Sequence, residues 1–190
     1  MSDDYASGLP IPAEDAARHA AYLAVRFPAT YAAVSAALAH VPAEALALVR
    51  TVLDIGAGPG TASLAALDVA PAVTHVAHVD RSRPLLDTGS RLLTEVSGDR
   101  AVALTQVVAD LASRQTWPAA DLVMAAYALA ELPTPARSAL VSSAWQATTS
   151  VLVLVEPGTP AGFDRIVEAR AALIASGATV VAPCPHGGPC

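Results

Sequence analysis

Hydrophobic positions along the chain change their spacing at Thr51. Between residues 13 and 49, Ala-rich segments place apolar side chains at intervals of three and four, a pattern that predicts helices. We expect Pro28 to lie in the first turn of one helix and Pro42 to precede another. Residues 1–49 are therefore expected to form an N-terminal helical extension.

From Thr51 onward, short continuous apolar runs alternate with segments long enough for helices. The predicted strands are 51–55, 74–80, 101–110, 121–127 and 150–156. The clearest helical segments are 59–70, 82–96, 134–148 and 161–177, and a further strand is expected over 178–182. Apolar strands that alternate with helices are typical of a parallel sheet covered on both faces. The sequence therefore predicts a doubly wound α/β domain over residues 50–182.

Composition narrows the class of protein. The 190 residues are 54% hydrophobic and 15% charged, so the chain can bury a sizeable core and is not expected to be disordered. No apolar run reaches the roughly 18 residues needed to cross a bilayer, and acidic residues precede the first hydrophobic stretch. We expect a soluble, cytoplasmic protein that does not enter membranes. The net charge of −6, with every basic residue an arginine, argues against tight nonspecific binding of nucleic acid.

The segment LDIGAGPG, residues 53–60, follows the first predicted strand. Gly56, Gly58 and Gly60 remove side chains that would keep a ligand away from the backbone, and they permit positive φ. Amides at the start of the next helix would then face the ligand. Doubly wound folds bind ligands at such turns, so a binding site is predicted here, although glycine used only for packing is the alternative.

The residues around this loop narrow the kind of ligand. A dinucleotide fingerprint needs a third glycine where this chain has Thr61, and a P-loop needs a lysine, which the chain lacks. The remaining pattern, D-x-G-x-G-x-G from Asp54 to Gly60, resembles the first motif of class I S-adenosylmethionine-dependent methyltransferases. That resemblance implies that the loop accommodates the methionine part of the cofactor.

Two later acids agree with an adenosine-bearing cofactor. Asp80 ends the second predicted strand, where a carboxylate can accept both ribose hydroxyls. Asp110 ends the third, and the resemblance implies that its side chain meets the adenine amino group. The alternatives are solvated acids at strand ends, or a helix cap in the case of Asp80. Together with Asp54, three acids at the ends of successive strands favour the cofactor site.

The fourth predicted strand leads into a loop that would lie over the reaction centre. Tyr127 and Glu131 in this loop could face cofactor or substrate, although a core tyrosine and a helix-start glutamate are equally reasonable. The loop lacks the Asn/Asp-Pro-Pro-aromatic signature of amino-methyltransferases and the Pro-Cys of pyrimidine-carbon methylation. No residue in it is identified as a general base.

The last seven residues, CPHGGPC, contain both cysteines of the chain. Cys184, His186 and Cys190 lie in a Pro/Gly-rich segment where thiolates can converge on zinc or an iron–sulfur cluster. Two cysteines cannot complete either site, so free thiols at the chain end are the alternative. Cys184 as a pyrimidine-methylating nucleophile is disfavoured, because it follows the sixth predicted strand and not the fourth.

Four blocks, at residues 26–34, 53–60, 155–170 and 182–190, together resemble the methyltransferase-like family of small-ribosomal-subunit assembly factors of bacteria and mitochondria. The resemblance implies a class I methyltransferase fold, an S-adenosylmethionine pocket and association with the small ribosomal subunit and its rRNA. It also implies a four-cysteine [4Fe–4S] site in which Cys184 and Cys190 are the first two ligands. The other two ligands and the last sheet strands would lie downstream, so 183–190 is expected to be the start of a truncated cysteine segment, with a cluster only in a longer chain.

Three functions remain open at this point. The first is an S-adenosylmethionine-dependent methyltransferase acting on rRNA of the small subunit. The second is a non-catalytic assembly or RNA-binding module that keeps the fold, and it is motivated by the missing catalytic signature. The third, a nicotinamide-dependent reductase, is disfavoured by Thr61. The oligomeric state is not determined.

Overall fold

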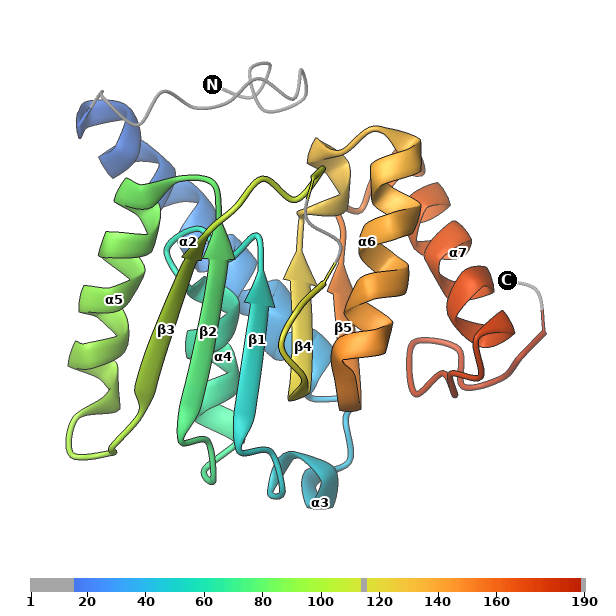
Figure 1. Ribbon diagram of the computed structural model, residues 1–190, viewed down its shortest axis with the longest axis horizontal. Coiled ribbons are helices and arrows are strands. Elements are labelled where there is room, and N and C mark those ends of the chain that lie inside the picture. The colour runs from blue at the N-terminus through green and yellow to red at the C-terminus, as the bar shows by residue number, and fades with distance from the viewer. Residues whose placement is uncertain (1–15, 114–115, 189–190) are drawn as a thin grey trace.

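Five parallel strands form the centre of the molecule (Figure 1). The computed structural model describes residues 16–113 and 116–188. The strand order across the sheet is β3-β2-β1-β4-β5, and every neighbouring pair is parallel. The strands are Thr51–Ile55 (β1), His75–Asp80 (β2), Ala103–Val108 (β3), Ala120–Ala126 (β4) and Thr148–Val155 (β5).

Helices cover both faces of this sheet (Figure 1). One face packs against α2 (Ala16–Leu38), α4 (Thr61–Val69) and α5 (Arg83–Ser97). The other packs against the 3-10 turn η1 (Leu129–Glu131), α6 (Thr134–Ala147) and α7 (Pro160–Ala175). A short helix, α3 (Ala43–Leu46), joins α2 to β1. The three-layer α/β architecture predicted from the sequence is confirmed.

The two hydrophobic cores explain why the central strands β1 and β4 are largely apolar on both faces. Val52 and Leu122 point toward α2 and α4, whereas Leu53 and Val123 point toward α6, and all four side chains are buried. Successive side chains of a strand face opposite sides of the sheet, so a strand covered on both faces needs apolar residues at both. This is the physical basis of the continuous apolar runs in the sequence.

The order of the strands creates a crevice at their carboxyl ends. After β1 the chain builds β2 and β3 on one side, then crosses over and builds β4 and β5 on the other. The loops that follow β1 and β4 therefore diverge, and ligands of doubly wound folds bind at this switch point. The site described below lies there.

The structure corrects the prediction that Pro28 begins a helix. Pro28 lies inside α2, which continues on both sides of it. A proline inside a helix removes one backbone hydrogen bond and causes a local clash. Burial of Val34 and Leu38 against the sheet, and the contact of the Tyr31 hydroxyl with Asp68 on α4, hold α2 in place despite this cost. Pro42 precedes α3 as expected.

The strand predicted over 178–182 is also corrected, because this segment is not a strand. The chain turns at Gly177, whose φ is +91°, and the amide of Ala178 donates to the carbonyl of Leu173. The guanidinium of Arg170 then donates to the carbonyls of His186 and Gly188. These contacts keep the segment beside α7 and away from the edge of β5.

Two further boundaries differ from the sequence analysis. The third strand is shorter than 101–110, so Asp110 lies beyond the end of β3. The helical extension also packs directly on the sheet, since Val34 and Leu38 belong to its core. The division into 1–49, 50–182 and 183–190 stays a prediction.

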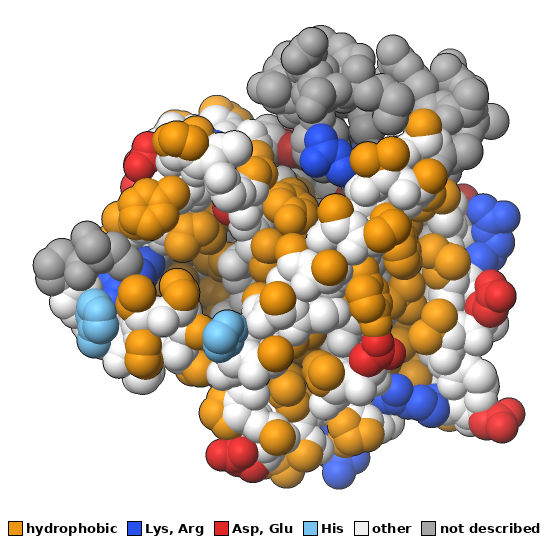
Figure 2. Space-filling model, turned by 180° about the vertical axis from the view of Figure 1, so that it is seen from behind, with side chains coloured by type: hydrophobic (Ala, Val, Ile, Leu, Met, Phe, Trp, Pro, Cys, Tyr) orange, Lys and Arg blue, Asp and Glu red, His pale blue; other side chains and the backbone are white. Residues whose placement is uncertain are grey.

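Large hydrophobic side chains also occur on the surface. Leu48 is 77% exposed, and Val25 and Phe163 are each about three-fifths exposed. Figure 2 shows hydrophobic side chains over much of the middle of the face opposite to Figure 1, with most charged groups toward its margin. Among helices of the described ranges, none is both long and apolar enough to span a bilayer.

Candidate functional site

The glycine loop leaves β1 and enters α4 with three residues in the left-handed half of backbone space. The φ values of Gly56, Gly58 and Gly60 are +74°, +53° and +75°. The amides of Gly56 and Ala57 both donate to the carbonyl of Val79 at the end of β2, at 2.8 and 2.9 Å. The loop is therefore fixed by hydrogen bonds to the neighbouring strand, and the conformation requires glycine.

Three close contacts set the position of this loop. A Cβ on Gly56 would lie 2.9 Å from Cβ of Ala128, and one on Gly60 would lie 2.6 Å from Cε1 of His78. On the α5 side, a Cβ on Gly89 would lie 2.9 Å from the carbonyl carbon of Pro59. Gly89 is a positioning residue that the sequence analysis missed, because nothing near it in the sequence points to contact with the loop.

Asp54 lies beneath the loop and is almost completely buried. One carboxylate oxygen accepts hydrogen bonds from the amide and the hydroxyl of Ser63, at 3.1 and 2.9 Å. Burial raises the pKa of Asp54 to about 6, against the opposing effect of the bonds from Ser63. Asp54 thus ties the end of β1 to the first turn of α4 and also borders the cavity.

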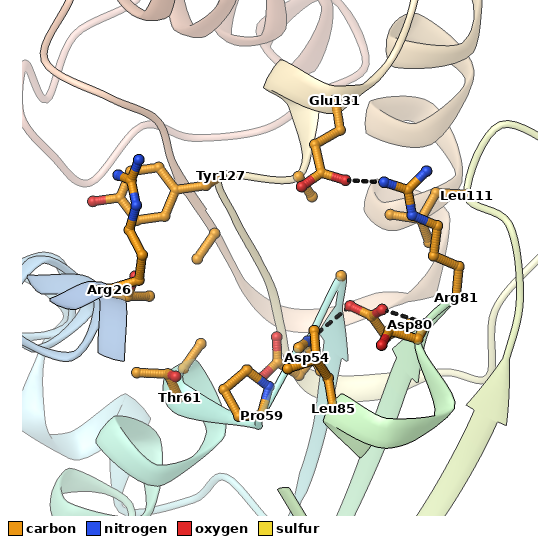
Figure 3. Close-up of a pocket in the computed structure, with 18 of the residues that line it drawn as sticks. Arg26, Asp54, Pro59, Thr61, Asp80, Arg81, Leu85, Leu111, Tyr127 and Glu131 are labelled. Carbon is orange, nitrogen blue, oxygen red and sulfur yellow. Dashed lines mark hydrogen bonds and ion pairs between the residues drawn. The ribbon is translucent and has the colours of Figure 1, made fainter. Parts of the chain in front are cut away.

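Asp80 joins the loop to the start of α5. One of its oxygens accepts from the amide of Gly58 at 2.8 Å, and the other accepts from the amide of Ser82 at 2.7 Å (Figure 3). Ser82 is the residue that immediately precedes α5. The alternative considered from the sequence was that Asp80 caps the next helix. The N-cap residue is Ser82, so Asp80 holds the residue before the helix and also borders the cavity.

Asp110 lies in the turn after β3. Its carboxylate accepts from the amide of Ala112 at 2.9 Å, and its carbonyl accepts from the amide and hydroxyl of Ser113. The strand ends at Val108 because the chain turns here, which is why Asp110 is not a strand residue. Its side chain still borders the same cavity as Asp54 and Asp80.

These residues surround one cavity of about 320 Å³ at the carboxyl ends of the strands (Figure 3). Of the six residues predicted to contact a cofactor, five line it: Asp54, Gly56, Gly58, Asp80 and Asp110. Gly60 does not, because it packs on His78. The size falls at the lower end of the range for small-molecule sites.

The far side of the cavity is formed by α2, which the sequence analysis did not foresee. Arg26, Phe27 and Thr30 line it. These residues lie in the block 26–34 that carries part of the family resemblance, and this was the available signal. The helical spacing alone could not show that α2 packs over the carboxyl ends of the strands.

Tyr127 follows β4 and borders the cavity. Its φ is +62°, a conformation that is strained for an aromatic residue. Its amide donates to the carbonyl of Val155 at 2.7 Å, and its ring extends toward Arg26 (Figure 3). Burial raises the pKa of its hydroxyl, so Tyr127 stays a neutral phenol at physiological pH.

Glu131 lies at the end of η1 and forms an ion pair with Arg81, with Nη2 and Oε2 3.3 Å apart. Burial raises the pKa of Glu131, and the positive charge of Arg81 opposes that rise. Both side chains are close to half exposed. The cavity is thus lined by four carboxylates and two guanidiniums: Asp54, Asp80, Asp110, Glu131, Arg26 and Arg81.

This arrangement is suited to binding a polar cofactor. The first amides of a helix have no acceptor within the helix, and those of Thr61 and Ala62 begin α4 at the cavity. Carboxylates at the ends of β1 and β2 can accept from ligand hydroxyls or amines. Glu131 is occupied by Arg81, so it is not positioned as a free general base.

Comparison with known proteins agrees with the fold and the motifs. The family model described as "Mitochondrial small ribosomal subunit Rsm22" matches residues 16–190. The chain belongs to this family. A human relative, described as "Ribosome assembly protein METTL17, mitochondrial", is 33% identical over 187 residues, which cover 89% of this chain and 40% of the relative. The chain thus spans about two-fifths of the length of this curated relative.

Solved structures similar to this Rsm22-family chain are methyltransferases. Magnesium protoporphyrin IX methyltransferase from Synechocystis, solved with bound S-adenosylmethionine, is 22% identical, with a TM-score of 0.56 over 76% of this chain and 66% of that one. The sugar N-methyltransferase KedS8 from Streptoalloteichus is 18% identical, with a TM-score of 0.55 over 80% of this chain and 57% of that one. At these identities the likeness shows a shared fold, the class I methyltransferase fold.

The cysteine segment of the Rsm22-family chain is only partly described. Cys184 is half-buried and free, and Cys190 lies outside the described residues. In the ranges 16–113 and 116–188, no group of three or more His, Cys, Asp or Glu side chains is placed to hold a metal ion. The structure therefore brings together five of the six residues predicted to contact a cofactor, and both the cofactor contacts and the metal ligands stay predictions.

Proposed function

We propose that this chain binds S-adenosylmethionine in the cavity and serves the small ribosomal subunit, in its assembly or by methylating its rRNA. The observation that carries the proposal is the convergence of the glycine loop, Asp54, Asp80 and Asp110 on one cavity at the switch point of the sheet. Membership in the Rsm22 family and the ribosome-assembly description of the human relative support the ribosomal part.

The residues present fit the cofactor. Gly56 and Gly58 leave the backbone open to the cavity, and a Cβ at Gly56 would already meet Ala128. Asp80 and Asp110 both line the cavity. Asp80 would accept from the ribose hydroxyls and Asp110 from the adenine amino group, and the loop after β1 would accommodate the amino-acid part. When bound, the cofactor supplies a methyl group on a positively charged sulfur.

The contribution of the chain to a transfer would be positioning and exclusion of water. The loop and Asp80 would hold the donor, and α2, whose Phe27 lines the cavity, would limit access of solvent. Tyr127 can donate one hydrogen bond from its neutral phenol. These features are compatible with catalysis but do not include a free base.

The specific observation that favours a non-catalytic module is the pairing of Glu131 with Arg81. Because of this ion pair, the loop after β4 (residues 127–133) presents to the cavity no ionised side chain that lacks a partner. A protein of this kind would use the cofactor-bound fold to dock on the small subunit.

Calorimetric titration tests the cofactor. We expect S-adenosylmethionine to bind and NAD not to bind, and Asp80→Asn to weaken binding at least tenfold, because it loses the anionic ribose acceptor. Asp87→Asn is the matched control, since Asp87 is an exposed acid on α5 that pairs with Arg83 outside the cavity. Binding of NAD in place of S-adenosylmethionine, or of neither, would contradict the proposal.

Transfer of tritium from methyl-labelled S-adenosylmethionine to small ribosomal subunits separates the two functions. Label in rRNA supports methylation. Cosedimentation with small subunits without label supports the assembly module. If this chain neither labels nor cosediments with them, the ribosomal part of the proposal is wrong.

The metal site and the cellular location are further proposals. Cys184 and Cys190 would be the first two ligands of a [4Fe–4S] cluster, or of zinc, in a chain that continues past Cys190. Iron and zinc analysis of such a chain, purified anaerobically, should find metal that Cys184→Ser reduces, and absence of both metals would exclude the cluster. A cytoplasmic location is tested by cell fractionation.

A further inference from the structure

Glu131 and Asp80 face each other across the cavity (Figure 3). Asp80 ends β2, and Glu131 lies in η1 just after β4, and these two strands flank β1 on opposite sides. Asp80 is bonded to the glycine loop through the amide of Gly58, and Glu131 lies on the other side of the cavity (Figure 3). A ligand that binds along the loop and fills the cavity would pass between the two carboxylates.

Three charged side chains act on Glu131. Burial has the largest effect and raises the pKa of Glu131, the charge of Arg81 lowers it, and the charges of Asp80 and Glu156 raise it. Glu156 is fixed nearby in a buried ion pair with Arg165, with Nε and Oε2 2.5 Å apart. Glu131 is thus a partly desolvated carboxylate that pairs with Arg81 and is repelled by two other carboxylates.

A cation between Glu131 and Asp80 would relieve this repulsion. S-adenosylmethionine and its product S-adenosylhomocysteine differ by one methyl group and one positive charge at sulfur. The sulfur joins the methionine part, expected at the loop, to the ribose, expected at Asp80. It would therefore lie close to the space between the two carboxylates.

We propose that Glu131 makes the cavity selective for charge, so that it binds the sulfonium cofactor more tightly than the neutral thioether product. This inference rests on the proposed function and adds a specificity-determining residue to it. Removing the negative charge of Glu131, which is partly desolvated and would lie near the sulfur, should change the affinity for a cationic ligand about 5- to 10-fold. The same selectivity would favour release of product after a transfer.

Titration calorimetry at pH 8 and low salt tests this with three ligands: S-adenosylmethionine, S-adenosylhomocysteine and sinefungin, whose amine replaces the charged sulfur centre. We expect the native protein to bind the two cations more tightly than S-adenosylhomocysteine. Glu131→Gln should weaken both cations about 5- to 10-fold and change S-adenosylhomocysteine less than about twofold. Asp87→Asn, outside the cavity, should change none of them.

Arg81→Met tests whether the sign of the charge in the cavity controls the preference for cationic ligands. Because Arg81 opposes the negative charge of the cavity, its removal should increase the preference for the two cations, opposite to Glu131→Gln. A loosened loop would instead move both variants in the same direction. Three results would overturn the inference while leaving cofactor binding intact. They are a shift of both variants in the same direction, an equal loss of affinity for all three ligands in Glu131→Gln, and the absence of a charge preference in the native protein. Failure of the native protein to bind any of the three would overturn the proposed function as well.

Discussion

At the scale of single residues, Asp54 and His78 form an unusual neighbouring pair. They are opposite each other in the register of β1 and β2, and both are buried. Burial raises the pKa of Asp54 from 3.8 to about 6 and lowers the pKa of His78 from 6.5 to about 4. Neither ring nitrogen of His78 has a hydrogen-bond partner within the described chain. Burial therefore shifts each pKa toward the neutral form of its group, because charge is costly in this environment.

The two pKa shifts make the unfolding free energy depend on pH in opposite directions. Between about pH 4 and 6, Asp54 binds more protons in the folded than in the unfolded chain, so its contribution to the unfolding free energy falls as pH rises. Between about pH 4 and 6.5, His78 binds more protons in the unfolded chain, so its contribution rises with pH. Each slope is at most about 1.4 kcal/mol per pH unit, so the two largely cancel.

We predict that single substitutions separate these slopes. Asp54→Asn should make the unfolding free energy rise more steeply from pH 4 to 6, by up to about 1 kcal/mol per pH unit. His78→Leu should make it fall over the same range. Urea denaturation at a series of pH values measures both, with Asp87→Asn as the surface control. Parallel pH profiles for the two variants and the native protein would contradict the pKa assignments.

Gly60 packs against the ring of His78 and does not line the cavity. Alanine there would be strained at φ +75° and would clash with the His78 ring. Gly177 has φ +91° with no atom within 4 Å of its Cβ position, so alanine there adds strain alone. We expect Gly177→Ala to cost about 1 kcal/mol and Gly60→Ala about 1–3 kcal/mol more in urea denaturation. Equal losses would show that the His78 contact is unimportant.

At the scale of elements, α4 depends on a residue far away in the sequence. Arg100, which follows α5, donates to the carbonyls of Leu67, Ala70 and Pro71 at 2.9 to 3.2 Å. The last carbonyls of a helix have no partner within the helix, and α4 has no basic residue in its own last turn. Arg100 thus closes the end of the helix whose beginning forms the cavity.

Replacing Arg100 should destabilise this element. We predict that Arg100→Met lowers the unfolding free energy by about 1–2 kcal/mol and increases hydrogen exchange in α4. Arg83→Met is the control, because its exposed ion pair with Asp87 contributes less than about 1 kcal/mol. Equal effects of the two variants would mean that Arg100 does not stabilise the helix end.

The success of the sequence analysis also differed from element to element. Strands β1, β2 and β4 were predicted closely because most of their side chains are buried on both faces, which leaves a continuous apolar run. The edge strand β5 was predicted closely as well, because it keeps an apolar run although most of its side chains are only half-buried. The predictions for Pro28 and for residues 178–182 were wrong because tertiary contacts outweighed the local preference of the sequence. Packing of α2 outweighs a proline, and Arg170 holds the tail beside α7.

At the scale of the whole molecule, the fold class followed from the sequence alone, and so did the convergence of the acids predicted to contact a cofactor. Strand and helix periods are local properties, and the carboxyl ends of parallel strands necessarily meet at one edge of the sheet. Asp54, Asp80 and Asp110 could therefore be placed together without knowing the packing.

Only the tertiary structure decided which other residues meet them. Arg26 on α2 and Arg81 after β2 reach the cavity, with Glu131 opposite Asp80 and His78 beneath Gly60. These contacts join segments far apart in the chain, and they depend on how helices pack on the sheet, which no local pattern contains. The sign of the charge in the cavity, and with it the expected preference for a cationic cofactor, follows from that packing.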